Sequence, residues 1–121
     1  MFNFFRKVFR KMKKEKIILY LNDEQLDLIT KILGKTRNDY LKKGIWIDEV
    51  YYLYNKFFSS NINDDKKIIL NEEEFNIVVN VLYKYRLECE ENNINTLELD
   101  YTLLEIITQK EEKGRQLDYA R

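Results

Sequence analysis

An internal duplication constrains this chain of 121 residues more than any other feature. Residues 21–26 read LNDEQL, and residues 70–75, 49 positions later, read LNEEEF. In both copies an asparagine is followed three residues later by Gln or Glu, which is the spacing of a capping box at the start of a helix. The flanking apolar residues have the spacing of a hydrophobic staple. Each copy therefore predicts the beginning of a helix.

The two predicted helices carry the same apolar stripe. Its positions recur at steps of three, four, three and four residues, the period of one helix face. They are Leu26, Ile29, Leu33, Thr36 and Tyr40 in the first copy, and Phe75, Val78, Leu82, Tyr85 and Cys89 in the second. Arg37 and Arg86 correspond in the same way. Gly44 is expected to end the first helix, and Asn92 with Asn93 the second.

A shorter helix is expected to follow each long one. Residues 45–48 and 97–100 share the pattern apolar, any, apolar, Asp, at a spacing of 52 instead of 49. This alignment predicts three additional residues in the second turn, with Asp48 and Asp100 as N-caps. Apolar, β-branched runs at 17–21 and 68–70 precede the long helices and are typical either of short strands, which could pair into a small ribbon, or of extended staple segments.

These patterns predict a mainly α fold: a tandem repeat of two helical hairpins packed as a four-helix arrangement, with a small two-stranded sheet and an N-terminal amphipathic helix. Neither hairpin can bury its stripe alone, so the copies are expected to face each other across a pseudo-twofold axis. The alternative is an open pair of hairpins that closes its core by dimerising. The expected segments are an N-terminal helix at 1–15, one domain at 16–110 with repeats at 16–58 and 66–110 and a linker at 59–65, and a charged, frayed tail at 111–121.

The composition excludes most catalytic and metal-binding classes. The chain has no histidine, three scattered glycines and one cysteine, which removes zinc sites, Ser-His-Asp triads and glycine-rich phosphate loops. A duplicated helix–loop–helix also describes an EF-hand pair, but the turns lack the Asp-x-Asp-x-Asp-Gly series that calcium needs. Cys89 is interpreted as a small core residue. We therefore expect no enzyme activity, no catalytic residue, no metal site and no cofactor.

The N-terminal segment differs in charge from the rest of the chain. Residues 1–16 hold seven basic residues and one acidic residue, whereas residues 17–121 hold fourteen and twenty. On a helical projection this basic arm separates an apolar face from a cationic one. Its candidate membrane- or anion-binding residues are Phe2, Phe5, Phe9, Arg6, Lys7, Arg10, Lys11, Lys13 and Lys14.

Several roles are open to the basic arm. Its apolar face can dock on the domain's own core or form a homodimer seam, and its pattern also suits a helix lying on an anionic membrane surface. Nucleic acid is a weaker alternative, because the acidic body offers no second basic patch. A start at Met12 would remove most of the arm. The lone cysteine and the absence of a long apolar run predict a cytoplasmic protein, membrane-associated if the arm binds lipid.

The predicted helix that follows Asp48 is rich in aromatic residues. Val50, Leu53, Tyr54 and Phe57 share the arc expected to face the core. The remaining aromatic surface exceeds what one buried face can use, and exposed Trp and Tyr side chains anchor protein interfaces. The candidate partner-binding residues are accordingly Trp46, Tyr51, Tyr52 and Phe58. The alternative is that other helices cover them.

The sequence therefore predicts a non-enzymatic protein–protein interaction module whose partner is another protein. Small size, duplication and the residue usage of an AT-rich genome suit an accessory protein of a phage or mobile element, with an inhibitor, adaptor or immunity-type role. One alternative is a peripheral membrane-surface protein anchored by the basic arm. The other is a weak nucleic-acid binder that uses the same arm.

Overall fold

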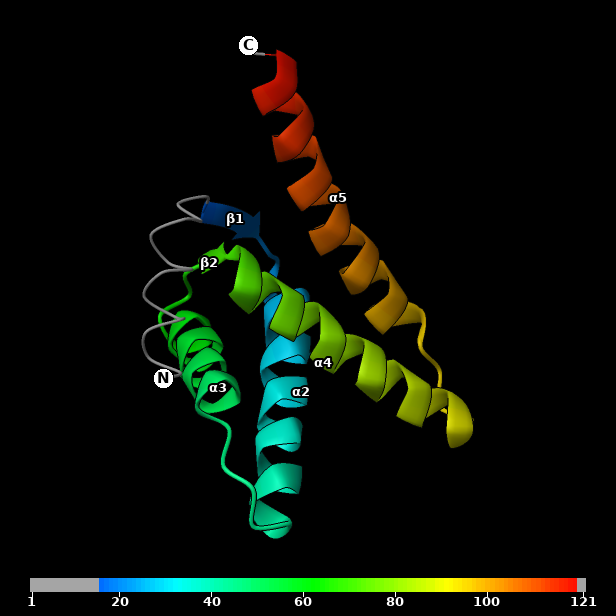
Figure 1. The fold of residues 1–121 in the computed structure, drawn as a ribbon. Coiled ribbons are helices and arrows are strands. Elements are labelled where there is room, and N and C mark those ends of the chain that lie inside the picture. Colours follow the sequence, from blue (N-terminus) through cyan, green and yellow to red (C-terminus); the bar gives the residue numbers. More distant parts are fainter. Residues whose placement is uncertain (1–15, 120–121) are drawn as a thin grey trace.

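The duplication of the sequence is also a duplication of the structure. The computed structural model describes the backbone of residues 16–119 and the side chains of residues 16–112. The elements are β1 (Lys16–Tyr20), α2 (Asp23–Lys42), α3 (Asp48–Ile62), β2 (Lys67–Asn71), α4 (Glu72–Glu91) and α5 (Leu97–Tyr119) (Figure 1). Within these residues the chain is mainly helical, with four helices and one two-stranded antiparallel sheet. The predicted mainly α fold with a small two-stranded sheet is confirmed, and the predicted N-terminal helix at 1–15 lies outside the described residues.

Both predicted capping boxes form. The Asn22 side chain accepts a hydrogen bond from the Gln25 amide at 2.8 Å, and the Gln25 side chain accepts one from the Asn22 amide at 3.1 Å. Asn71 and Glu74 repeat this exchange at 2.7 and 2.9 Å. Each box satisfies amides that the first helical turn leaves without a partner, so each long helix begins where its asparagine predicts.

The two strands pair about the centre of the repeat. Leu19 lies directly opposite Ile68, and these two residues are 49 positions apart, so equivalent positions of the two copies meet there. The twofold axis of the antiparallel pair therefore passes between them. Residues Ile17, Leu19, Ile68 and Leu70 are buried on one face of the sheet. The Gln109 side chain of α5 covers the outer edge of β1, because its amide exchanges two hydrogen bonds with the Tyr20 backbone, each 2.9 Å long.

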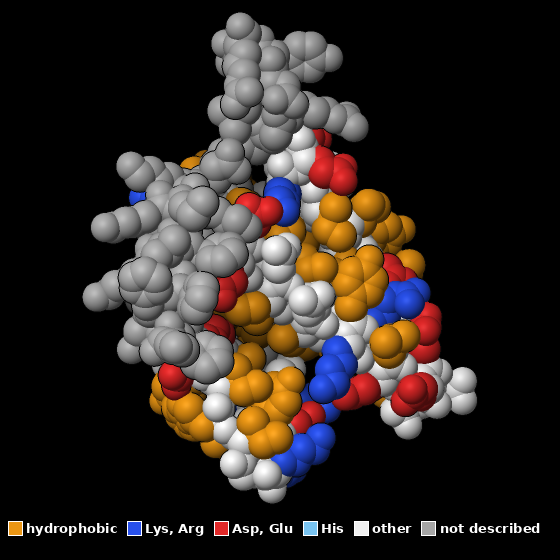
Figure 2. Space-filling view, in the orientation of Figure 1, with side chains coloured by type: hydrophobic (Ala, Val, Ile, Leu, Met, Phe, Trp, Pro, Cys, Tyr) orange, Lys and Arg blue, Asp and Glu red, His pale blue; other side chains and the backbone are white. Residues whose placement is uncertain are grey.

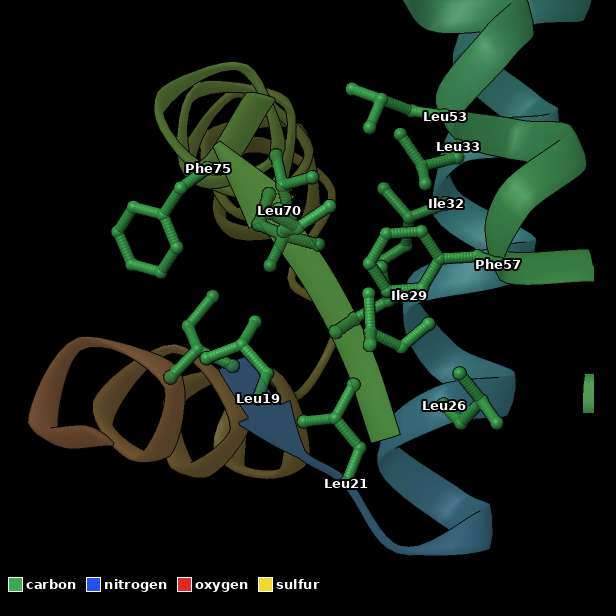
Figure 3. Packing of buried hydrophobic residues seen from close by; sticks show 14 of the residues in the cluster. Leu19, Leu21, Leu26, Ile29, Ile32, Leu33, Leu53, Phe57, Leu70 and Phe75 are labelled. Carbon is green, nitrogen blue, oxygen red and sulfur yellow. The ribbon is translucent and has the colours of Figure 1, made fainter. Parts of the chain in front are cut away.

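One hydrophobic core joins the two repeats within a single chain. Side chains from the two strands and from α2, α3 and α4 form one buried cluster, in which Phe57 of α3 points toward β2 and Phe75 of α4 lies on the other side of that strand (Figure 3). Leu99, Leu103 and Ile106 bring the first half of α5 into the same cluster. Cys89 is buried, as predicted. The predicted stripes supply this core, except that Thr36, Tyr40 and Tyr85 are only partly buried.

The long helices end in the same turn in both repeats. Gly44 and Asn93, 49 positions apart, both adopt positive φ, at 72° and 58°. The backbone N–H of Ile45, which follows Gly44, donates to the Tyr40 carbonyl at 2.8 Å. The N–H of Ile94, which follows Asn93, donates to the Cys89 carbonyl at the same distance. Glycine and asparagine are the residues that adopt this left-handed conformation most readily. The helix stops predicted at these positions are confirmed.

The prediction of three additional residues in the second turn is wrong. The shorter helices begin at Asp48 and Leu97, again 49 positions apart. The N-cap of α3 is Ile47, Asp48 is its first residue, and Asp100 lies inside the first turn of α5. The short apolar-x-apolar-Asp pattern aligned the helices incorrectly, because the packed face determines their register. Val50, Leu53 and Phe57 occupy the positions of Leu99, Thr102 and Ile106, and all six are buried.

Two helix ends also differ from the predicted segments. Helix α3 continues to Ile62, inside the segment 59–65 predicted as a linker, and stops before Asp64, which has a φ of 53°. Helix α5 continues to Tyr119, through residues expected to fray. Polar composition suggested both boundaries, but no proline interrupts either helix, so hydrogen bonding can continue beyond the buried part.

The two hairpins differ in shape. Helix α3 packs along α2, whereas α5 diverges from α4 and lies beside β1 (Figure 1). The first repeat therefore presents a continuous two-helix face. The candidate site lies on that face.

Candidate functional site

The four predicted partner-binding residues are all exposed. Their exposed fractions are 56% for Trp46, 38% for Tyr51, 57% for Tyr52 and 43% for Phe58. Tyr51 and Phe58 share one side of α3 with Tyr54, at the spacing of a helical stripe. The Trp46 ring lies 4.7 Å from that of Tyr51, and the Tyr54 ring lies 5.7 Å from that of Phe58. The structure thus brings three of the four together.

Arg37 of α2 connects these aromatic residues. Its guanidinium carbon lies 4.3 Å from the centre of the Tyr54 ring and 5.9 Å from that of Tyr51, within cation–π range. We call Arg37, Trp46, Tyr51, Tyr54 and Phe58 the aromatic–arginine surface.

The charge of Arg37 has no carboxylate partner among the residues that the structure describes. Its Nη2 donates to the Asn38 side chain at 3.2 Å. Its Nε is buried and has no hydrogen-bond acceptor. A buried donor without an acceptor is costly, so the position of this side chain needs a compensating interaction.

Gly34 makes room for the aromatic–arginine surface. A Cβ at this position would lie 3.0 Å from the Tyr54 ring. Glycine within a helix costs about 1 kcal/mol relative to alanine, but here it allows the ring to lie close against the backbone of α2. Tyr54 is therefore held between α2, Arg37 and Phe58.

A groove of about 610 Å³ runs along the same face, between α2 and α3. Tyr54, Phe58 and Arg37 line it together with charged residues of α2. Lys31 holds Asp27 at 2.8 Å, and Lys35 holds Asp39 at the same distance. These hydrogen bonds lower the pKa of both aspartates and keep them ionised.

Tyr52 lies apart from the other three candidates. It lines a separate cavity of about 370 Å³ with Asp48, Glu49 and Glu73, between α3 and the start of α4. The ammonium of Lys56 lies 5.7 Å from the centre of the Tyr52 ring. Residues Tyr51 and Tyr52 are consecutive on a helix, so their side chains point about 100° apart. Tyr52 therefore lies on a different side of α3 from Tyr51 and Phe58, and its role in partner binding stays a prediction.

The sequence pattern points to no role for Arg37 and places Tyr54 on the arc that faces the core. Tyr54 is partly buried and packs against the core while its ring contacts Arg37. The signal was present, because Tyr51, Tyr54 and Phe58 follow a helical spacing next to the arc of Leu53 and Phe57. An exposed stripe of Leu97, Tyr101 and Leu104 on α5 was also missed. Hydrophobic side chains gather over α5 and α4 in Figure 2.

The second repeat holds its equivalent arginine differently. Arg86 donates from Nε to Oδ1 of Asp100, and its Nη1 lies 2.7 Å from Glu90. The hydrogen bond from Arg86 lowers the pKa of Asp100, and the same bond raises the pKa of Arg86. The positions of Asp100 and Glu90 are occupied in the first repeat by Tyr51 and Leu41. The arginine is thus paired in one repeat and lies on aromatic rings in the other.

The Arg86–Asp100 pair predicts a pH dependence. Because the folded pKa of Asp100 is below its unfolded value, its stabilising effect is present above the ordinary carboxyl pKa and is lost as pH falls through the folded value. Asp100→Asn should lower stability at neutral pH and make the decline of the unfolding free energy in acid less steep. Urea denaturation at several pH values measures this slope. In an Arg86→Gln background the same substitution should change the slope little; an equal change in both backgrounds would contradict the pairing.

The predicted roles of residues 1–14 lie outside the described residues, so docking, dimerisation, membrane binding and nucleic-acid binding through the basic arm stay predictions. Among residues that the structure describes, no helix is long and apolar enough to cross a membrane. The described part of the chain also contains no group of three or more acidic or cysteine side chains arranged to hold a metal ion. Comparisons with protein-family models, curated proteins and solved structures find no significant match.

Proposed function

We propose that this protein is a non-enzymatic interaction module that binds another protein through its aromatic–arginine surface. The difference between the two repeats carries the proposal. The second repeat builds the same hairpin elements without these aromatic residues. At the positions of Trp46, Tyr51, Tyr54 and Phe58 it has Asn95, Asp100, Leu103 and Ile107. The shared elements of the repeat do not require an aromatic side chain at any of these positions.

The chemistry of the surface favours a protein partner. Trp, Tyr and Arg are the residue types most enriched among those that dominate binding energy at protein interfaces. The ring contacts between Trp46 and Tyr51 and between Tyr54 and Phe58 hold the side chains in place before binding. Ordering them on association therefore costs less entropy. An inhibitor, adaptor or immunity-type role, in a phage or mobile element, falls within this class.

Quantitative affinity capture tests the proposal. The full chain, a Trp46→Ala/Tyr51→Ala variant and a Tyr101→Ala control are each immobilised and exposed to extract of cells that naturally produce the protein. We expect a partner retained by the wild type and the control, and depleted about tenfold or more by the double variant, since each lost hot-spot residue costs about 1 kcal/mol or more. Tyr101 is 63% exposed, against 56% for Trp46 and 38% for Tyr51, so it controls for general loss of surface aromatics.

Thermal melting of all three proteins must precede the capture. Trp46 and Tyr51 are exposed, so the double variant should keep a melting temperature close to that of the wild type. Equal retention of every captured protein by the wild type and a folded double variant would overturn the proposal.

A further inference from the structure

The second repeat shows which group binds the arginine that is equivalent to Arg37. There an aspartate carboxylate of the neighbouring helix binds Arg86. The equivalent helix of the first repeat places Tyr51 where Asp100 stands, so it supplies no carboxylate to Arg37. Instead, Tyr51 and Tyr54 provide flat apolar surfaces beside the guanidinium. The first repeat therefore keeps the cation of this pair and lacks the anion.

The guanidinium of Arg37 retains hydrogen-bonding capacity. An arginine side chain has five N–H donors, and the structure records a hydrogen bond from Nη2 only, to Asn38. Arg37 lines both the groove between α2 and α3 and the small hollow that contains Trp46. A group bound to it from solvent would therefore lie beside the aromatic rings.

The charges along the groove favour a single acidic group over a polyanion. Asp27 and Asp39 line the groove and are each neutralised by a lysine. Lys42, at the C-terminal end of α2, adds a second positive charge to the part of the groove that Arg37 lines. A nucleic-acid backbone needs several phosphate contacts for affinity, but Lys31 and Lys35 are already paired with these two aspartates, which leaves the groove few cations for a row of phosphates. A protein segment with one carboxylate next to an apolar side chain matches the groove better.

We infer that the partner segment occupies the groove between α2 and α3 and places an Asp or Glu carboxylate on Arg37, with an apolar side chain against Tyr54 and Phe58. This inference rests on the proposed function and adds the chemistry of the partner. The carboxylate does for Arg37 what Asp100 does for Arg86, but it binds the Nη atoms from the groove, because Tyr51 stands at the position of Asp100 and the Nε of Arg37 is buried. A planar, bidentate contact between guanidinium and carboxylate then gives the surface its specificity.

Selection of peptides on the immobilised full chain tests this inference. A random-peptide display library is selected for binding, and the recovered peptides are synthesised with their acid and with Asp→Asn or Glu→Gln in its place. Because Trp46 is the only tryptophan, its fluorescence reports binding at the surface. The proteins titrated are the wild type, Arg37→Gln, Arg37→Lys and the matched control Arg86→Gln, which alters the same position of the other repeat.

We expect the recovered peptides to share an acidic residue next to an apolar one. Neutralising that acid, or Arg37→Gln, should raise Kd about tenfold or more, the effect of losing a charge-assisted hydrogen bond. Arg37→Lys should restore only part of the affinity, and Arg86→Gln should leave it unchanged while lowering thermal stability. Combining Arg37→Gln with the neutralised peptide should add no further loss.

The alternative outcomes separate this inference from the proposed function. Peptides that bind at Trp46 without an acidic residue, or with the same Kd for Arg37→Gln, would overturn the carboxylate inference and leave the interaction surface in place. Peptides whose binding is unaffected by a Trp46→Ala/Tyr51→Ala variant, or a selection that yields no binder, would count against both.

Discussion

Replacing Phe57 with alanine is expected to lower the free energy of unfolding by about 3–5 kcal/mol, the usual cost of removing a buried phenylalanine ring. Phe57 has no exposed surface, and its ring lies between α2 and the strand pair at the centre of the core (Figure 3). The side chains around it belong to both repeats, so the cavity would weaken the contact between them. Urea denaturation followed by circular dichroism measures the change.

The adjacent Phe58 provides a matched control. It has the same side chain on the same helix, but 43% of it is exposed and it stacks on Tyr54 outside the core. Phe58→Ala should cost about 1.5 kcal/mol or less, while weakening the partner binding proposed for the aromatic–arginine surface. Similar losses of stability for the two variants would show that Phe58 also belongs to the core and would remove it from the proposed surface.

Replacing Ile68 with alanine should be comparably severe, at about 2–5 kcal/mol. Ile68 is almost fully buried and lies opposite Leu19, where equivalent positions of the two repeats meet. Its side chain therefore lies in the part of the core where the two repeats meet. The midpoint and slope of the urea transition measure the loss and show whether unfolding stays cooperative.

Ile69→Ala tests the strand register with the same substitution one residue later. Ile69 points to the opposite face of β2, where 39% of it is exposed, so we expect a loss of about 1 kcal/mol. A slip of one residue would exchange the two faces of the strand. A larger loss for Ile69→Ala than for Ile68→Ala would therefore contradict the register.

The elements that the sequence predicted well are those determined by local chemistry. The capping boxes at Asn22 and Asn71 satisfy amides within three residues, and the turns at Gly44 and Asn93 depend on backbone conformations that few residues adopt. Both signals operate over a single helical turn, so a short stretch of sequence contains all the information. The apolar stripes are also a local signal, and they predict which face of each long helix packs against the core.

The start of the shorter helices was predicted wrongly for the opposite reason. The matched Asp48 and Asp100 look like caps, but Asp100 is bound by Arg86, fourteen residues earlier in the chain. Which residue of α5 begins the helix depends on placing Leu99, Thr102 and Ile106 against the core. Such a packing requirement involves elements far apart in the sequence, and it outweighs a weak local preference.

The candidate site shows the same division. An excess of aromatic residues around α3 was sufficient to predict that Trp46, Tyr51, Tyr52 and Phe58 would be exposed, because one helix face cannot bury them all. The helical spacing also predicts that Tyr52 lies on the far side of α3 from the core-facing arc, and the structure agrees. The contact of Arg37 with Tyr54 was not predictable in this way, because Arg37 reaches the surface from α2.

The two copies of a strand and a helical hairpin follow from local sequence, since the caps, turns and stripes each occur twice and each acts over a few residues. The difference between the surfaces of the two copies depends on tertiary packing. Packing α3 along α2 brings Arg37 onto Tyr51 and Tyr54, whereas the equivalent Arg86 binds Asp100. The reason is physical: the partner of a charged side chain is set by what the neighbouring helix places beside it, and that placement results from packing of the core.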